Sequence, residues 1–167
     1  MSPGVNRPVR KVMWIDHLSL LPGDPSVTTT HNAVNSGVGG GLAALVVHSS
    51  TTGENAQGGG NKVVWTALEV PPGFNVVGVR LCYELTSAHS FISQVRLAQV
   101  QNPPATASVL LDDPTNHTAV GPLCVDVKSP TIDPAKGALL LDLRVSFGNT
   151  ADRIAIRGVA LWLVAKA

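Results

Sequence analysis

In the stretch from Leu139 to Phe147, LLLDLRVSF, every second residue is apolar, and from Leu141 onward apolar and polar residues alternate. A β-strand turns successive side chains to opposite faces, so this alternation predicts a strand with one buried face and one polar face. The predicted buried side chains are Leu139, Leu141, Leu143, Val145 and Phe147. Residues 77–85 repeat the pattern, with Val77, Val79, Leu81, Tyr83 and Leu85 alternating with Gly78, Arg80, Cys82 and Glu84.

Turn-forming residues separate eight or nine such segments, and 16 Gly and 12 Pro supply the breaks between them. No segment has a long helical period. Short alternating strands with frequent turns are typical of sandwiches, so we expect an all-β, antiparallel β-sandwich, jelly-roll-like in its connections. The length of 167 residues fits one domain. We expect an irregular segment over 1–10, a single sandwich domain over 11–167, and flexible Gly-rich loops near 35–41 and 51–62.

The C-terminal strand departs from this alternation. Residues 138–147 and 153–164 are predicted to form a hairpin across residues 148–152, but residues 158–165 (GVALWLVA) are apolar on both faces. A strand with two apolar faces is covered on both sides. The N-terminal segment or a second subunit could provide the cover. We therefore expect a homo-oligomer with Val159, Leu161 and Leu163 at the subunit interface.

The charge content argues against nucleic acid as a partner and allows association between copies of the chain. The formal net charge is +1, which gives no basic field for nucleic acid. Only 14% of residues are charged, so repulsion between copies is weak and self-association is tolerated. No apolar run reaches the roughly 18 residues of a membrane span, and the N-terminus does not resemble a signal peptide. The cytoplasm, or a larger particle, is the default location.

Six residues are candidates for ligand binding. Arg80, Glu84, Arg96 and Arg144 fall mid-strand on the polar faces, where neighbouring strands would bring them together. The candidates Trp14 and Trp65 could form an aromatic platform of the kind on which sugar rings stack. The polar strand face that carries the four charged candidates could bind a glycan or a protein. It could equally be an ordinary solvated or subunit-facing sheet surface.

Catalytic and metal-site motifs are lacking. The sequence has no GxSxG elbow, and its five histidines do not have the spacing of metal ligands. Residues 112–116 (DDPTN) have oxygen ligands of the kind that calcium binds. The pattern nevertheless favours a turn, because Asp and Asn stabilise turns through local hydrogen bonds. The Gly-rich loops lack a phosphate-binding pattern. We expect no cofactor and no metal.

The two cysteines, Cys82 and Cys124, both lie on predicted strands. They form a disulfide if those strands face each other, and otherwise they are buried thiols.

Three functions are compatible with these features. The leading hypothesis is a non-catalytic, self-associating structural or binding module, such as a virion, phage or receptor-binding component. The first alternative is a carbohydrate-binding module that uses the aromatic platform. The second is a small β-fold enzyme with a diffuse acid–base or metal site, in which Asp16, His17 and an arginine would be the acid–base groups.

Overall fold

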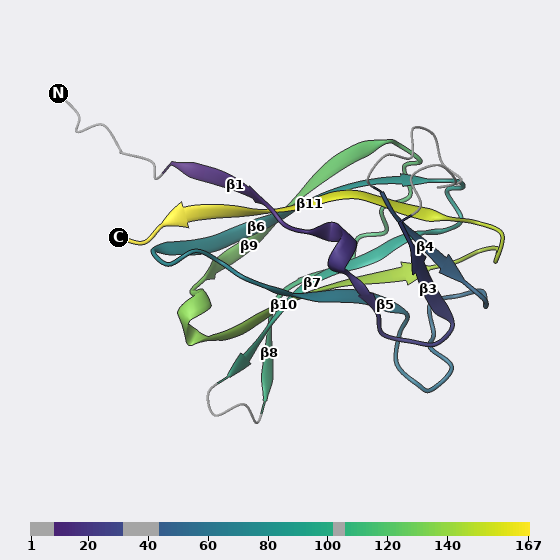
Figure 1. The fold of residues 1–167 in the computed structure, drawn as a ribbon, viewed down its shortest axis with the longest axis horizontal. Coiled ribbons are helices and arrows are strands. Elements are labelled where there is room, and N and C mark those ends of the chain that lie inside the picture. Colours follow the sequence, from purple (N-terminus) through teal and green to yellow (C-terminus); the bar gives the residue numbers. More distant parts are fainter. Residues whose placement is uncertain (1–8, 32–43, 102–105) are drawn as a thin grey trace.

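The structure is a computed structural model, and it describes residues 9–31, 44–101 and 106–167. These residues form two antiparallel sheets packed face to face (Figure 1). The strands are β1 (Arg10–Trp14), β2 (Leu21–Pro22), β3 (Val27–Thr30), β4 (Leu45–Ser49), β5 (Val63–Leu68), β6 (Phe74–Leu85), β7 (Phe91–Gln101), β8 (Ala107–Asp113), β9 (Leu123–Ile132), β10 (Gly137–Ser146) and β11 (Ile154–Ala165). Two short 3-10 helices, η1 (His17–Ser19) and η2 (Pro134–Lys136), lie between strands.

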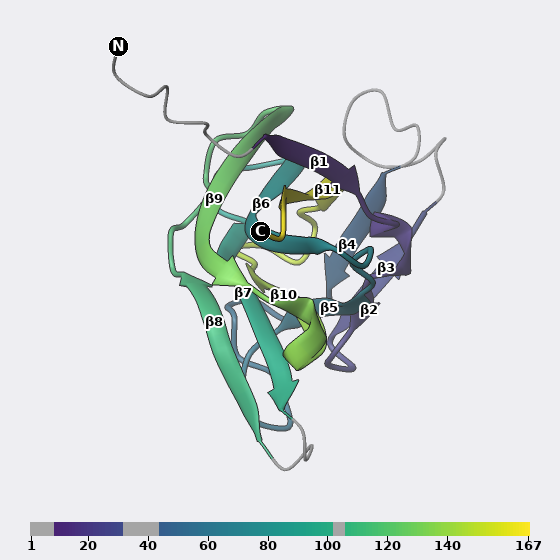
Figure 2. The same ribbon diagram turned by 90° about the vertical axis from the view of Figure 1, so that its left-hand side faces the viewer.

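Sheet A has the order β3-β4-β11-β6-β9, with β1 also paired to β11, and sheet B has the order β2-β5-β10-β7-β8. Most consecutive strands from β4 onward alternate between the two sheets, so the chain crosses the sandwich repeatedly. Figure 2 shows the two layers, with β1, β6, β9 and β11 above β7, β8 and β10. The predicted antiparallel, jelly-roll-like sandwich is confirmed.

The core lies between the sheets and is built from the predicted alternation. Leu139, Leu141, Leu143, Val145 and Phe147 are all buried, while the intervening side chains of β10 are half-buried on the outer face. The expectation for Val77 is wrong. Trp162 pairs with Gly78 and Leu163 with Val76, so Val77 is an extra residue at a bulge. The bulge turns Val76 into the core and leaves Val77 half-buried.

The predicted C-terminal hairpin is also wrong. β10 pairs with β5 and β7 in sheet B, whereas β11 pairs with β1, β4 and β6 in sheet A. Residues 148–152 therefore connect the two sheets rather than two paired strands. A buried face is required of a strand in either sheet, so alternation alone cannot decide which neighbour a strand takes.

The interface prediction also changes. Val159, Leu161 and Leu163 are 0%, 0% and 3% exposed and belong to the core shared by the two sheets. An interface built from these side chains would require the sandwich to open. The N-terminal segment supplies the edge partner, because β1 pairs along residues 160–164 of β11. β1 thus lies beside β11 in the same sheet, and on the outer face the Trp14 ring of β1 covers Gly158.

Residues 1–8 and the predicted loop at 35–41 lie outside the described residues. The loop over 51–62 is anchored by Lys62, a fully buried residue whose ammonium donates hydrogen bonds to the carbonyls of Thr51, Thr52 and Gly53 at 2.7, 3.2 and 3.1 Å. Burial lowers the pKa of Lys62, and the charge of Asp24 partly opposes that shift. Among the described residues, no helix is long and apolar enough to cross a membrane.

Candidate functional site

The six candidate binding residues separate onto the two outer faces of the sandwich. Trp65, Arg96 and Arg144 belong to sheet B, whereas Trp14, Arg80 and Glu84 belong to sheet A. The structure therefore contains two polar faces, each with tryptophan, rather than one combined site.

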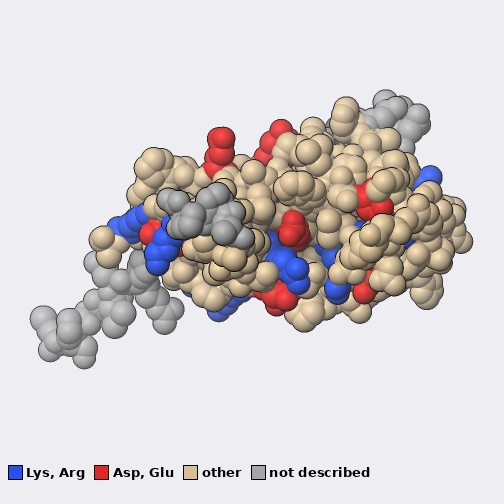
Figure 3. Space-filling view, turned by 90° about the horizontal axis from the view of Figure 1, so that it is seen from below, with Lys and Arg blue, Asp and Glu red and all other residues tan. Residues whose placement is uncertain are grey.

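On sheet B, the strand register aligns a row of side chains across the whole sheet. Leu21 pairs with Trp65, Trp65 with Asp142, Asp142 with Arg96, and Arg96 with Asp112. Directly paired residues point to the same face of an antiparallel sheet, so these five side chains form one line. Figure 3 views this side of the molecule and shows acidic and basic groups interleaved near the middle of the surface.

Trp65 is the aromatic member of the row. It is 38% exposed, which is high for such a large apolar side chain. A β-carbon added at Gly23 would lie 3.6 Å from Cδ1 and Nε1 of the indole, so the backbone at Gly23 lies close to that edge of the ring. Leu21, the next residue along the row, is 61% exposed and extends the apolar surface.

Asp142 lies between Trp65 and Arg96 and forms no hydrogen bond with the described residues. Burial raises the pKa of Asp142, and the positive charge of Arg96 acts in the opposite direction. The Nε atom of Arg96 is also buried without a hydrogen-bond partner among the described residues. A carboxylate acceptor and a guanidinium donor therefore stand side by side with hydrogen-bonding capacity to spare.

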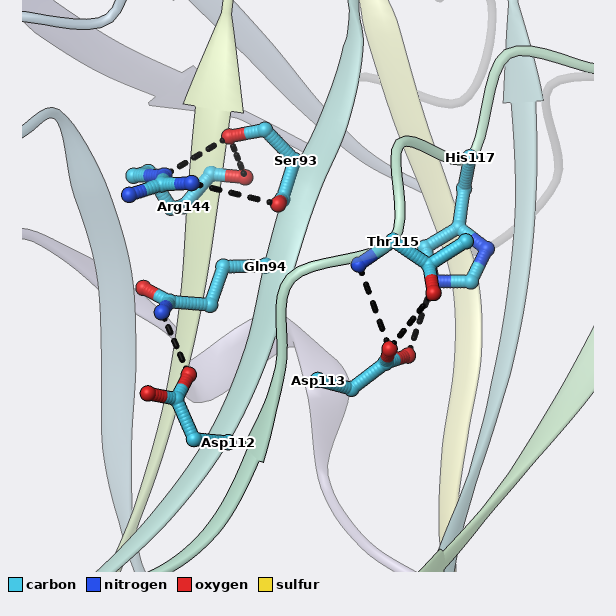
Figure 4. Close-up of polar contacts among 7 residues, drawn as sticks. All are labelled: Ser93, Gln94, Asp112, Asp113, Thr115, His117 and Arg144. Carbon is cyan, nitrogen blue, oxygen red and sulfur yellow. Dashed lines mark hydrogen bonds and ion pairs between the residues drawn. The ribbon is translucent and has the colours of Figure 1, made fainter.

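Other polar side chains of this face hydrogen-bond to one another, and Figure 4 shows the contacts of Gln94 with Asp112 and of Arg144 with Ser93. Arg96 pairs with Asp112 at 3.3 Å, and Gln94 donates a hydrogen bond to the same carboxylate. Arg144 donates to the Ser93 hydroxyl at 2.9 Å and lies 3.5 Å from the Glu54 carboxylate. The contacts to Asp112 orient the Arg96 end of the row, whereas those of Arg144 lie beside it.

The outer face of sheet A carries a second constellation. Arg80 makes two hydrogen bonds to Asp126, at 2.9 and 3.1 Å, and its guanidinium lies 4.8 Å from the centre of the Trp162 ring. The Trp162 indole N–H also donates to Asp126 at 3.0 Å. Arg157 pairs with Glu84 at 3.0 Å farther along the sheet. Trp162 was not among the sequence candidates, because the apolar run around it suggested burial.

Trp14 lies on the same face of sheet A and is 58% exposed. A β-carbon added at Gly158 would lie 3.1 Å from the Trp14 ring, so the indole packs over this glycine of β11. Nearby, Cys82 and Cys124 pair directly across β6 and β9 and form a disulfide. The disulfide alternative is the one the structure adopts.

The described part of the chain contains no group of three or more His, Cys, Asp or Glu side chains that could hold a metal ion. Asp113 accepts hydrogen bonds from the backbone N–H and the hydroxyl of Thr115, at 3.1 and 2.6 Å, as in an ordinary Asx turn. Asp16 accepts from the Leu18 N–H and caps η1. The turn interpretation of residues 112–116 is thus supported.

No family model and no curated protein matches the sequence. Among solved structures, the CBM22-1 and GH10 modules of a Clostridium thermocellum endo-1,4-beta-D-xylanase complexed with xylohexaose are similar, with a TM-score of 0.55, 10% identity, and coverage of 95% of this chain and 28% of that chain. Two others are the carbohydrate-binding module CBM36 with calcium and xylotriose (TM-score 0.47, 9% identity, 90% and 98% covered) and a family 29 carbohydrate-binding module (0.45, 10%, 93% and 89%). The match with a TM-score of 0.55 shows that the chain shares its β-sandwich fold with part of the xylanase modules.

Proposed function

We propose that the chain is a carbohydrate-binding module and that it binds a neutral glycan on the outer face of sheet B. The observation that carries this proposal is the aligned row in which Trp65, Asp142 and Arg96 occupy neighbouring strands. A carbohydrate-binding module is the first alternative that the sequence allows, and the leading hypothesis from the sequence is a self-associating structural or binding module.

The chemistry of the row suits a pyranose. A sugar presents an apolar ring face, which packs against an exposed indole such as Trp65. Its hydroxyl groups both donate and accept hydrogen bonds. Asp142 offers an acceptor and Arg96 a donor, and neither group has all of its hydrogen-bonding capacity satisfied within the described residues. A sugar hydroxyl would donate to Asp142 and accept from an N–H at the partly exposed end of the Arg96 guanidinium, since the unpaired Nε of Arg96 is itself buried.

The geometry of the face favours an extended ligand. The row crosses five strands that are spaced about 4.8 Å apart, so it runs for about 19 Å over an open sheet surface. A glycan chain lying along the row would contact several strands at once. The similarity to a xylanase module complexed with xylohexaose supports the same class of ligand at the level of the fold.

Calorimetric titration with soluble neutral polysaccharides (a xylan, a mannan and a mixed-linkage glucan) tests this proposal. We expect saturable binding to at least one of them, and a loss of about tenfold in affinity for Trp65→Ala, which corresponds to roughly 1.4 kcal/mol. Trp14→Ala is the matched control, because it removes an exposed tryptophan from the opposite face. Equal binding by wild type and Trp65→Ala would place the site elsewhere.

A further inference from the structure

A hollow of about 180 Å³ opens on the outer face of sheet A, on the opposite side of the sandwich from the Trp65 row. Its lining residues are Arg10, Val77, Gly78, Asp126, Val127, Lys128 and Trp162. In the strand register, Trp162 pairs with Gly78 and Gly78 pairs with Lys128. Gly78 has no side chain, so it forms a low floor between Trp162 and Lys128, whose strands are about 10 Å apart.

The indole that walls this hollow is held in place by its neighbours. Arg80 covers the Trp162 ring at 4.8 Å, and Asp126 accepts the indole N–H at 3.0 Å. An aromatic ring that is already ordered loses little conformational entropy when a ligand packs against it. The hollow therefore has a preorganised apolar wall.

The charged side chains around the hollow that have no ion-pair partner in the described part of the chain are positive. The carboxylate of Asp126 is taken up by two hydrogen bonds from Arg80, and these bonds lower the pKa of Asp126. Among the described residues, Lys128 and Arg10 form no ion pair with an acidic side chain. Two cations thus face the hollow beside a carboxylate that is already neutralised.

We propose that this hollow is a second binding site, which takes an anionic saccharide. The apolar face of the sugar ring packs against Trp162, and its acidic group lies between Lys128 and Arg10. The acidic group is either the carboxylate of a uronic acid or a sulfate ester, because both present oxygens that accept hydrogen bonds from ammonium and guanidinium groups. The inference shares with the proposed function only the assumption that the ligand is a saccharide.

Titration with three oligosaccharides of matched length tests the proposal: an oligogalacturonate, a sulfated oligosaccharide and a neutral oligosaccharide. We expect one or both acidic ligands to bind saturably, to change tryptophan fluorescence, and to bind about fivefold or more weakly to an Arg10→Ala, Lys128→Ala double variant. Lys136→Ala is the matched control, since it removes an exposed lysine of η2 outside the hollow. The two acidic arms distinguish a carboxylate from a sulfate.

Several outcomes would overturn the proposal. They are no binding of either acidic ligand at millimolar concentration, undiminished binding by the double variant, and an equal loss in Lys136→Ala, which would indicate unspecific attraction. A loss in Trp65→Ala but not in the double variant would place the acidic ligand on sheet B. Failure here together with intact binding of a neutral glycan would leave the proposed function standing.

Discussion

Trp65 of β5 lies directly opposite Asp142 of β10, and both side chains face outward from sheet B. This pairing joins a surface for packing against a sugar ring to a carboxylate that has no hydrogen-bond partner among the described residues. Arg96 follows on the next strand and completes the group. The proposed glycan site consists of these three side chains and the rest of the row on the outer face of sheet B.

Replacement of Asp142 by Asn should stabilise the protein at neutral pH. Burial raises the pKa of Asp142 above its ordinary value of 3.8, so the folded state holds the proton more tightly than the unfolded state. The resulting stabilisation is present below pH 3.8 and is lost as the pH rises through the folded-state pKa. Urea unfolding from pH 3 to 7 should therefore show a gain for Asp142→Asn at pH 7 that vanishes at low pH. A variant that is less stable than wild type at pH 7 would contradict this assignment.

Asp126 should show the opposite pH dependence. Hydrogen bonds from Arg80 lower the pKa of Asp126, so its contribution to stability is present above pH 3.8 and is lost as the pH falls through the folded-state pKa. Asp126→Asn should be less stable than wild type at pH 7, and the difference should shrink in acid. Urea unfolding over the same pH range measures it, and a difference independent of pH would mean that Arg80 does not act on the charge.

The buried ammonium of Lys62 should hold the 51–53 backbone in place. Lys62→Met removes three hydrogen bonds and leaves the carbonyls of Thr51, Thr52 and Gly53 without this donor, so we expect a loss of about 2 kcal/mol in unfolding free energy. Hydrogen exchange should also rise around residues 51–62, while Lys136→Met should leave both measurements unchanged. Unaltered exchange in Lys62→Met would show that the loop is held by other contacts.

The disulfide between Cys82 and Cys124 should contribute measurably to stability. The two residues are 42 positions apart. A cross-link that closes a loop of this length lowers the entropy of the unfolded chain and raises the free energy of unfolding by about 2–4 kcal/mol. Reduction, or replacement of both cysteines by Ala, should lower the midpoint of urea unfolding accordingly. Mass measurement before and after alkylation checks that the bond is present, and two alkylatable thiols in the unreduced protein would contradict the pairing.

The sequence predicted individual strands well because alternation is a local property. The buried series from Leu139 to Phe147 and the outward direction of Arg96 could both be derived from a period of two residues. Pairing between strands is not local. The row depends on β10 lying between β5 and β7, and nothing in residues 139–147 specifies those neighbours.

The same limit explains three errors, each of which involves a strand of sheet A. The five residues from 148 to 152 are compatible with a hairpin and equally with a crossing between sheets, and the structure uses the crossing. Val77 fits the alternation perfectly, but a bulge at this position displaces it from the core. Trp162 looked buried because its neighbours are apolar, whereas its indole lies among Arg80 and Asp126 on the outer face.

Titration of one neutral polysaccharide against wild type, Trp65→Ala and Trp14→Ala tests the account most directly. The wild type and Trp14→Ala should bind with similar affinity, and Trp65→Ala should bind about tenfold more weakly, as expected for the loss of a central aromatic contact. Circular dichroism should confirm that all three proteins are folded. Undiminished binding by Trp65→Ala, or a greater loss in Trp14→Ala, would contradict the assignment of the glycan site to sheet B.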